Sequence, residues 1–129
     1  MAKKVNKSQD KREFKTALRV GDVVQVLCGG NSKSGRDVKD CKGKVIAFLP
    51  KKNRVLVEGV NYIKRHKRAM SAGEKGGIVT KEAAVNISNV MFYSEEAKRP
   101  VRLIMKTLDN GSKVRGYKNP QTGAFEQVA

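Results

Sequence analysis

Residues 41–70 gather the side chains of this chain that are best suited to bind a polyanion. They include nine Lys or Arg and a single acid, Glu58, so thirty residues carry a net +8 of the formal +16. The cations are interleaved with two apolar runs, VIAFL and VLV, which predict two strands joined by the turn Pro50-Lys51-Lys52-Asn53. A folded hairpin holds cations as a fixed array, which can match the phosphates of a folded nucleic acid.

The candidate binding residues form two groups along the chain. The first, beside the hairpin, is Lys42, Lys44, Lys51, Lys52 and Arg54; the second is Asn61, Lys64, Arg65, His66, Lys67 and Arg68. Lys and Arg at strand ends neutralise phosphates without reading sequence, so specificity would come from the shape of a folded RNA. In an ordinary protein the first group would be a solvated basic face, and the density of cations here favours phosphate contact instead.

The second group lies on a segment, Tyr62–Arg68, that we expect to be extended. Side chains alternate along a strand, which puts Lys64, His66 and Arg68 on one side and Arg65 and Lys67 on the other. A strand with cations on both sides does not pack fully against a core, so we expect it to project into RNA or lie across it. Tyr62 either stacks on a base or belongs to the core or its rim, and His66 is a candidate hydrogen-bond donor or stacking ring.

Other chemistries are poorly supported. The chain has one His, scattered acids and no nucleophile motif, so we expect no enzyme, no cofactor and no small-molecule substrate. Cys28 and Cys41 lie at the two ends of the loop 29–40, and with one His they are too few for a four-ligand zinc site. We expect paired, buried, reduced thiols. The glycines near them do not form a phosphate-binding loop, because no Gly-Lys-Ser/Thr opens a helix.

Composition limits the class of partner and the cellular compartment that we expect. A net charge of +16 on 129 residues is a large self-repulsion that a polyanion would relieve. No apolar run approaches the ~20 residues needed to span a bilayer, and no basic amphipathic helix is evident, so nucleic acid is favoured over a membrane. The N-terminal residues are basic and lack an apolar signal region, which predicts a cytoplasmic protein.

The pattern of apolar runs and turns predicts an all-β fold with little helix. We expect strands at 23–28, 44–49, 54–58, 78–85 and 89–93, which together suggest a small, strongly bent antiparallel barrel. Residues 1–17 show no periodic spacing of apolar side chains, which predicts a flexible basic arm. We expect residues 18–93 to form the barrel with its projecting basic loop. Residues 94–129 form a short C-terminal β extension, with a hairpin turning at Asn110-Gly111, that packs on the barrel.

Several motifs in order carry a resemblance. They are GDVVQV at 21–26, KGKV at 42–45, PKKNRVLVEGVN at 50–61, KRHK at 64–67, GGIV at 76–79 and ISNV at 87–90. Together they resemble the KOW motif followed by the signature of the family of bacterial large-subunit ribosomal protein number twenty-four. The match runs from about Val20 to Tyr93. The loop 29–40 is longer than the usual KOW loop, and the loop after Arg68 lacks the prolines common in relatives.

The resemblance implies an SH3-like barrel in which Gly43 marks a strand bend that a Cβ would obstruct. It also implies a structural protein of the large subunit that contacts the 5′ region of the large-subunit rRNA, helps to initiate assembly and lies near the mouth of the peptide exit tunnel. Neighbouring large-subunit proteins would be its other partners. The alternative is a transcription elongation or antitermination factor of the KOW type, but only about twenty residues precede the motif here.

Overall fold

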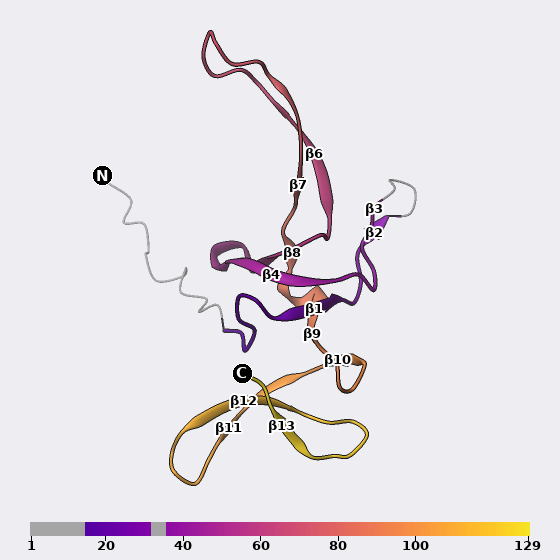
Figure 1. Cartoon of the computed structure of the whole chain (residues 1–129), viewed down its shortest axis with the longest axis vertical. Coiled ribbons are helices and arrows are strands. Elements are labelled where there is room, and N and C mark those ends of the chain that lie inside the picture. The colour runs from indigo at the N-terminus through magenta and orange to yellow at the C-terminus, as the bar shows by residue number, and fades with distance from the viewer. Residues whose placement is uncertain (1–14, 32–35) are drawn as a thin grey trace, which may run out of the picture.

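The computed structural model describes residues 15–31 and 36–129, and this part of the chain is nearly all β (Figure 1). The strands are β1 Val23–Val26, β2 Gly30–Asn31, β3 Arg36–Asp37, β4 Lys42–Leu49, β5 Arg54–Val57, β6 Tyr62–Lys67, β7 Gly77–Glu82, β8 Val85–Asn86, β9 Val90–Ser94, β10 Arg99–Val101, β11 Leu103–Thr107, β12 Lys113–Lys118 and β13 Phe125–Gln127. Two short 3-10 turns, η2 Pro50–Lys52 and η3 Ile87–Asn89, complete the described elements. The all-β prediction is confirmed, whereas most of the predicted N-terminal arm lies outside the described residues.

The body of the molecule is a six-stranded antiparallel sheet with the order β10-β9-β1-β4-β5-β8. Its core cluster consists of nine buried residues, all of them valines: Val24, Val26, Val38, Val45, Val55, Val57, Val60, Val85 and Val90. Short β-branched side chains suit the inside of a small, bent sheet, because they pack closely without needing the room of an aromatic ring. Leu18, Phe48 and Ile87 close the cluster at its edges.

The strand β4 turns back into β5 as the sequence predicts. Pro50 opens the 3-10 turn η2, and Asn53 ends it in the left-handed conformation with φ of 52°. The pairing shifts by one residue between Val45 and Ala47, so β4 bends at this point. Gly43 lies close to β5: a Cβ there would come within 2.2 Å of the Glu58 carbonyl oxygen.

Two hairpins leave the body. The pair β6–β7 extends away from the sheet as a long arm at the top of Figure 1. The shorter pair β2–β3 joins Gly30–Asn31 to Arg36–Asp37. This second hairpin corrects our expectation that 29–40 is a loop throughout, because the Gly- and Ser-rich composition that predicts a turn also permits a two-residue ladder on either side of it.

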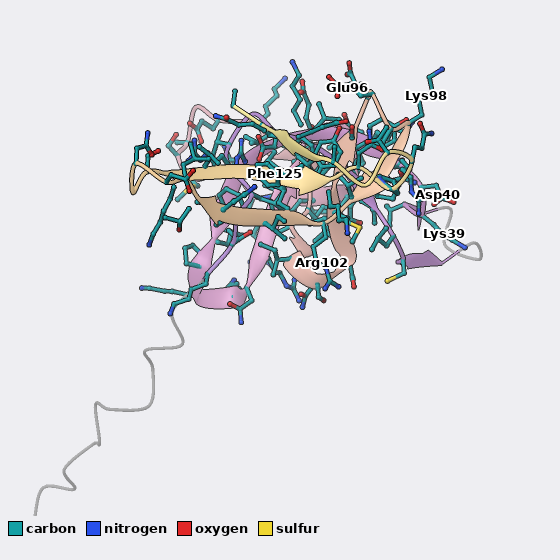
Figure 2. The ribbon with its side chains drawn as sticks, turned by 90° about the horizontal axis from the view of Figure 1, so that it is seen from below. Lys39, Asp40, Glu96, Lys98, Arg102 and Phe125 are labelled. Carbon is teal, nitrogen blue, oxygen red and sulfur yellow. The ribbon has the colours of Figure 1, made fainter. Side chains whose placement is uncertain are left out.

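A second sheet, ordered β11-β12-β13, lies at the opposite end of the molecule from β6–β7 (Figure 1). Its hairpin turns at Gly111, with φ of 81°, as Asn-Gly predicts. The first strand of this hairpin, β11, begins at Leu103, and Val101 ends the separate strand β10 on the edge of the main sheet. The loop before β10 carries Glu96 and Lys98, which Figure 2 shows apart from Arg102.

Buried polar groups attach the C-terminal sheet to the body. Arg115, 4% exposed, forms an ion pair with Asp22 and donates a hydrogen bond of 3.0 Å to the Ala17 carbonyl oxygen. On the same side, Tyr117 accepts a hydrogen bond of 2.7 Å from the Ser94 hydroxyl. A small apolar cluster of Ala97, Val101 and Tyr117 lies beside these contacts. One face of the C-terminal sheet therefore packs against the body.

Candidate nucleic-acid interface

The projecting hairpin carries most of the second predicted group. Six register pairs run from Tyr62 opposite Glu82 to Lys67 opposite Gly77. Ile63 is half-buried at the base, and every other residue of β6 is exposed. Strand β7 is exposed from Gly77 to Lys81. A two-stranded ribbon with solvent on both faces has no core of its own, so its cations are available to a partner.

The register divides the cations of the hairpin between two faces. Lys64 lies opposite Thr80 and His66 opposite Ile78, whereas Arg65 lies opposite Val79 and Lys67 opposite Gly77. The alternation that the sequence predicts for these residues is therefore present. Each face also presents an apolar side chain, since Ile78 is 62% and Val79 46% exposed. The hairpin thus offers cations and apolar surface on both sides.

An open hollow of about 470 Å³ lies along the hairpin. Met70 and Val79 supply apolar surface, and four cations supply its charge: Arg65, Lys67, Arg68 and Lys81. Lys81, two residues after the GGIV motif, is absent from our predicted residues. It faces the same side as Arg65 because it pairs with Ile63, two residues earlier on β6. Only the cross-strand pairing brings it into the cluster.

The cations of this hairpin are not paired with any acid of residues 15–31 and 36–129. Among the described residues, no ion pair involves Lys64, Arg65, Lys67 or Arg68. The acids of the hairpin itself are Glu74 in its loop and Glu82 at its base, and the Glu82 carboxylate accepts a hydrogen bond of 3.5 Å from the Gly59 backbone N–H. Four cations without counter-charges repel each other, and a polyanion relieves this repulsion.

The first predicted group does not form one surface. Lys42 and Lys44 begin β4, whereas Lys51 and Lys52 lie in η2 beyond its other end. The eight-residue strand separates the two pairs by roughly 23 Å, at about 3.3 Å per residue. Lys42 is also held in place, because its ammonium group lies 3.9 Å from the centroid of the Tyr93 ring. The sequence neighbours thus become two separate basic sites.

Arg54 and Asn61 instead lie together, although they come from different predicted groups. Both line a hollow of about 250 Å³ with Asn86 and Asn89. Asn61 adopts the left-handed conformation, with φ of 59°, and its side-chain amide lies 3.4 Å from the Ala83 carbonyl oxygen. Arg54 is exposed and pairs with Asn86 across β5 and β8. This hollow presents amide groups and one cation, which suits the polar edge of a nucleotide.

The expectation of paired, buried thiols is wrong for Cys28. Cys28 is exposed and donates a hydrogen bond of 3.3 Å to the Asn89 side chain, whereas Cys41 is half-buried against the valine core. Neither Cys28 nor Cys41 is part of a disulfide. In the described part of the chain, no group of three or more His, Cys, Asp or Glu is placed to hold a metal ion.

Tyr62 and His66 occupy positions that the sequence left open. Tyr62 is 51% exposed at the base of the hairpin, so it is not a core residue. His66 is exposed on the face that it shares with Lys64. Both rings are therefore accessible to a partner. Within the described residues, no helix has the length and apolar character needed to cross a membrane.

Known proteins are similar in sequence to most of this chain. The family model described as "Large ribosomal subunit protein uL24, C-terminal domain" matches residues 60–124. A protein of Geobacter metallireducens named large ribosomal subunit protein uL24 is 48% identical over 98 residues, which cover 76% of this chain and 83% of the relative. Proteins of the same name from Heliobacterium modesticaldum and Brevibacillus brevis are 44% and 46% identical, over 78% and 76% of this chain and 85% and 88% of their own lengths. This chain therefore belongs to the uL24 family.

Proposed function

We propose that this chain is a structural constituent of the large ribosomal subunit, in the cytoplasm, and that it binds large-subunit rRNA directly. The observation that carries the RNA contact is the β6–β7 hairpin, which extends from the body with exposed cations on both faces and no described acid paired with Lys64, Arg65, Lys67 or Arg68. The names of the relatives support the ribosomal role.

The hairpin binds by neutralising phosphates from two fixed strands. Because cations face both ways, the hairpin fits between two RNA segments better than onto one flat surface. Lys and Arg contacts to phosphate carry no sequence information, so the shape of the folded RNA selects the site. Lys42 and Lys44, the turn with Lys51 and Lys52, and the hollow with Arg54 and Asn61 add separate contacts around the body.

The finer parts of this function come from the family resemblance. We place the contact in the 5′ region of the large-subunit rRNA, with a part in early assembly and a position near the peptide exit tunnel. Neighbouring large-subunit proteins are further partners. We also propose the division into a basic arm at 1–17, a barrel at 18–93 and a C-terminal extension at 94–129. A role as a KOW-type transcription factor is not favoured, and no catalytic step is part of the proposal.

The salt dependence of rRNA binding tests the proposal. We expect affinity to fall steeply as salt rises, and each of Lys64→Ala, Arg65→Ala and Lys67→Ala to reduce the slope of log K against log salt by roughly 0.7–0.9. Lys113→Ala is the matched control, because Lys113 is an exposed strand cation at the other end of the molecule. The affinity is measured by filter binding of a transcript of the large-subunit rRNA.

Two results oppose the proposal in different ways. Wild-type protein that shows no preference for the rRNA over an unrelated RNA of equal length contradicts the function itself. Hairpin variants that keep the wild-type slope, while the protein still binds specifically, contradict only the placement of the contacts.

A further inference from the structure

The outer face of the β11–β13 sheet is a surface that the proposed function leaves unused. Arg115 and Tyr117 point toward the body, so their neighbours along β12 point away from it. The register then assigns to the outer face Ile104, Lys106, Val114, Gly116, Lys118, Phe125 and Gln127. Figure 2 looks onto this end of the molecule and labels Phe125 on the sheet. No described element covers this face.

Phe125 lies against β12 on the outer face because Gly116 leaves room for it. A Cβ on Gly116 would come within 2.6 Å of the Phe125 Cζ atom and 2.1 Å of the Glu126 carbonyl oxygen. The ring is half-buried, and Ile104 beside Gly116 is 42% exposed. An aromatic ring laid against a glycine, with an exposed aliphatic neighbour, forms a small apolar platform.

Cations flank this platform and no acid of the three strands faces it. The Lys106 ammonium group lies 5.3 Å from the centroid of the Phe125 ring, and Lys118 pairs with Phe125 across the strands. The one acid in these three strands is Glu126, which points inward and accepts hydrogen bonds from Tyr117 and Asn119. The charge that the strands present on the outer face is therefore wholly positive, which favours a polyanion over an uncharged apolar peptide.

We propose that this face, defined by Phe125, Lys106 and Lys118, is a second RNA-contact surface that takes an unstacked base of a single-stranded RNA segment. The base stacks on Phe125, and Lys106 and Lys118 contact the phosphates on either side. Stacking of bases on exposed aromatic rings beside cations is how proteins hold single-stranded RNA. The flexible stem of Lys106 lets its ammonium group leave the ring for a phosphate while the base takes its place.

The position of the surface gives it a separate role. It lies at the opposite end of the molecule from the β6–β7 hairpin (Figure 1), so one RNA segment at each end is bridged by the body between them. The inference rests on the proposed function, since it requires an RNA partner. It goes beyond that function because it assigns a stacking contact to residues outside both predicted groups.

The fluorescence of a single introduced tryptophan can detect base stacking at each end of the molecule. The chain contains no Trp, so Phe125→Trp and, separately, Tyr62→Trp introduce one fluorophore each. Each full-length variant is titrated with the large-subunit rRNA transcript and, in parallel, with a mixture of large-subunit proteins free of RNA. We expect the rRNA to quench the fluorescence of the Phe125→Trp variant, because a stacked base quenches indole emission. Ile104→Trp, on the same face, replaces Phe125→Trp if that variant loses its native circular dichroism.

The outcomes separate this inference from the proposed function. Quenching at position 125 by rRNA supports the second surface. Specific binding of rRNA with no change at 125 overturns the inference and leaves the function standing. A change at 125 with the protein mixture but not with rRNA also overturns it, because the surface then binds protein. Absence of specific rRNA binding overturns both.

Substitutions give an independent measurement of the same contact. We expect Phe125→Leu, which keeps apolar packing and loses the ring, to weaken rRNA binding about five- to tenfold. Lys106→Met should reduce the salt slope by roughly 0.7–0.9. Lys113→Met is the control, because Lys113 pairs with Thr107 and points to the other face of the same hairpin. Equal effects of Lys106→Met and Lys113→Met would show a diffuse charge effect and overturn the assignment.

Discussion

The two ends of this molecule are both built from antiparallel strands rich in cations, yet they are held in different ways. The β6–β7 hairpin is exposed on both faces and is joined to the body at its base alone (Figure 1). The β11–β13 sheet buries Arg115 and Tyr117 on one face and exposes Lys106 and Lys118 on the other. Exposed side chains of the hairpin contribute little to folding. In the C-terminal sheet, one face stabilises the fold and the other face is available for binding.

The largest difference is expected from the ion pair that anchors the C-terminal sheet. Arg115→Met leaves the largely buried Asp22 side chain without its partner, and breaking a buried pair costs about 3–5 kcal/mol. We expect a loss of about 3 kcal/mol in the free energy of unfolding, measured by urea denaturation. Adding Asp22→Asn to this variant should restore part of the loss. Lys113→Met is the control on the same strand, and a loss equal to that of Arg115→Met would contradict the comparison.

Glycine-to-alanine substitutions compare the packing of the body, the C-terminal sheet and the hairpin, with a smaller expected loss of stability. A Cβ at Gly43 would come within 2.8 Å of the Val57 Cγ1 atom, and one at Gly116 would meet the backbone of β13, so Ala at either position should cost about 1–3 kcal/mol. A Cβ at Gly77 in the hairpin would have no heavy atom within 4 Å, so Gly77→Ala should change the stability by less than about 0.5 kcal/mol. Thermal unfolding of the three variants checks this. A destabilised Gly77→Ala would show that the hairpin packs on something.

The hydrogen-bond network behind the C-terminal sheet predicts a pH dependence. The Glu126 carboxylate accepts a hydrogen bond from the Tyr117 hydroxyl, and this bond raises the pKa of Tyr117 above its usual value of 10.0. The folded state therefore holds this proton more tightly, and stability should fall as pH rises above about 10. Tyr117→Phe should lose about 1 kcal/mol at neutral pH and no longer show this alkaline loss. An unchanged alkaline slope in the variant would assign the effect to other groups.

At acidic pH the same network predicts the opposite pH dependence of stability. Hydrogen bonds from Asn119 and then Tyr117 lower the pKa of Glu126 below its usual value of 4.5. Its contribution to stability is present above that value and is lost as the pH falls through the lower, folded-state pKa. Glu126→Gln should therefore show a shallower fall in melting temperature below pH 4.5 than the wild type. A steeper fall in the variant would contradict this sign.

The smallest effect is expected at Cys28. Its thiol is exposed and donates to the Asn89 side chain, and a Ser hydroxyl can donate in its place, so Cys28→Ser should change the stability by less than about 0.5 kcal/mol. A thiol reagent should modify Cys28 faster than the half-buried Cys41. Equal rates of modification in the native protein would contradict the different burial of the two thiols.

Local patterns determined much of this protein. Alternating valines predict the strands that form the body, because a side-chain period of two places Val24 and Val26 on one buried face. Pro50 and Asn53, and Asn110-Gly111, predict turns through the backbone conformations that those residues favour. The cations of 64–68 on both sides of one strand already predict a segment that leaves the core. These signals are readable from sequence because each depends on residues close along the chain.

Tertiary structure decided which distant residues meet. Lys81 joins Arg65 through the register of β6 and β7. Arg54 and Asn61 meet at one hollow, whereas Lys42 and Lys51 are separated by the length of β4. The exposure of Cys28 and the orientation of Phe125 likewise depend on which face a strand turns to its neighbours. Composition and spacing contain no register, because a slip of one residue would exchange the two faces of a strand while leaving the sequence unchanged.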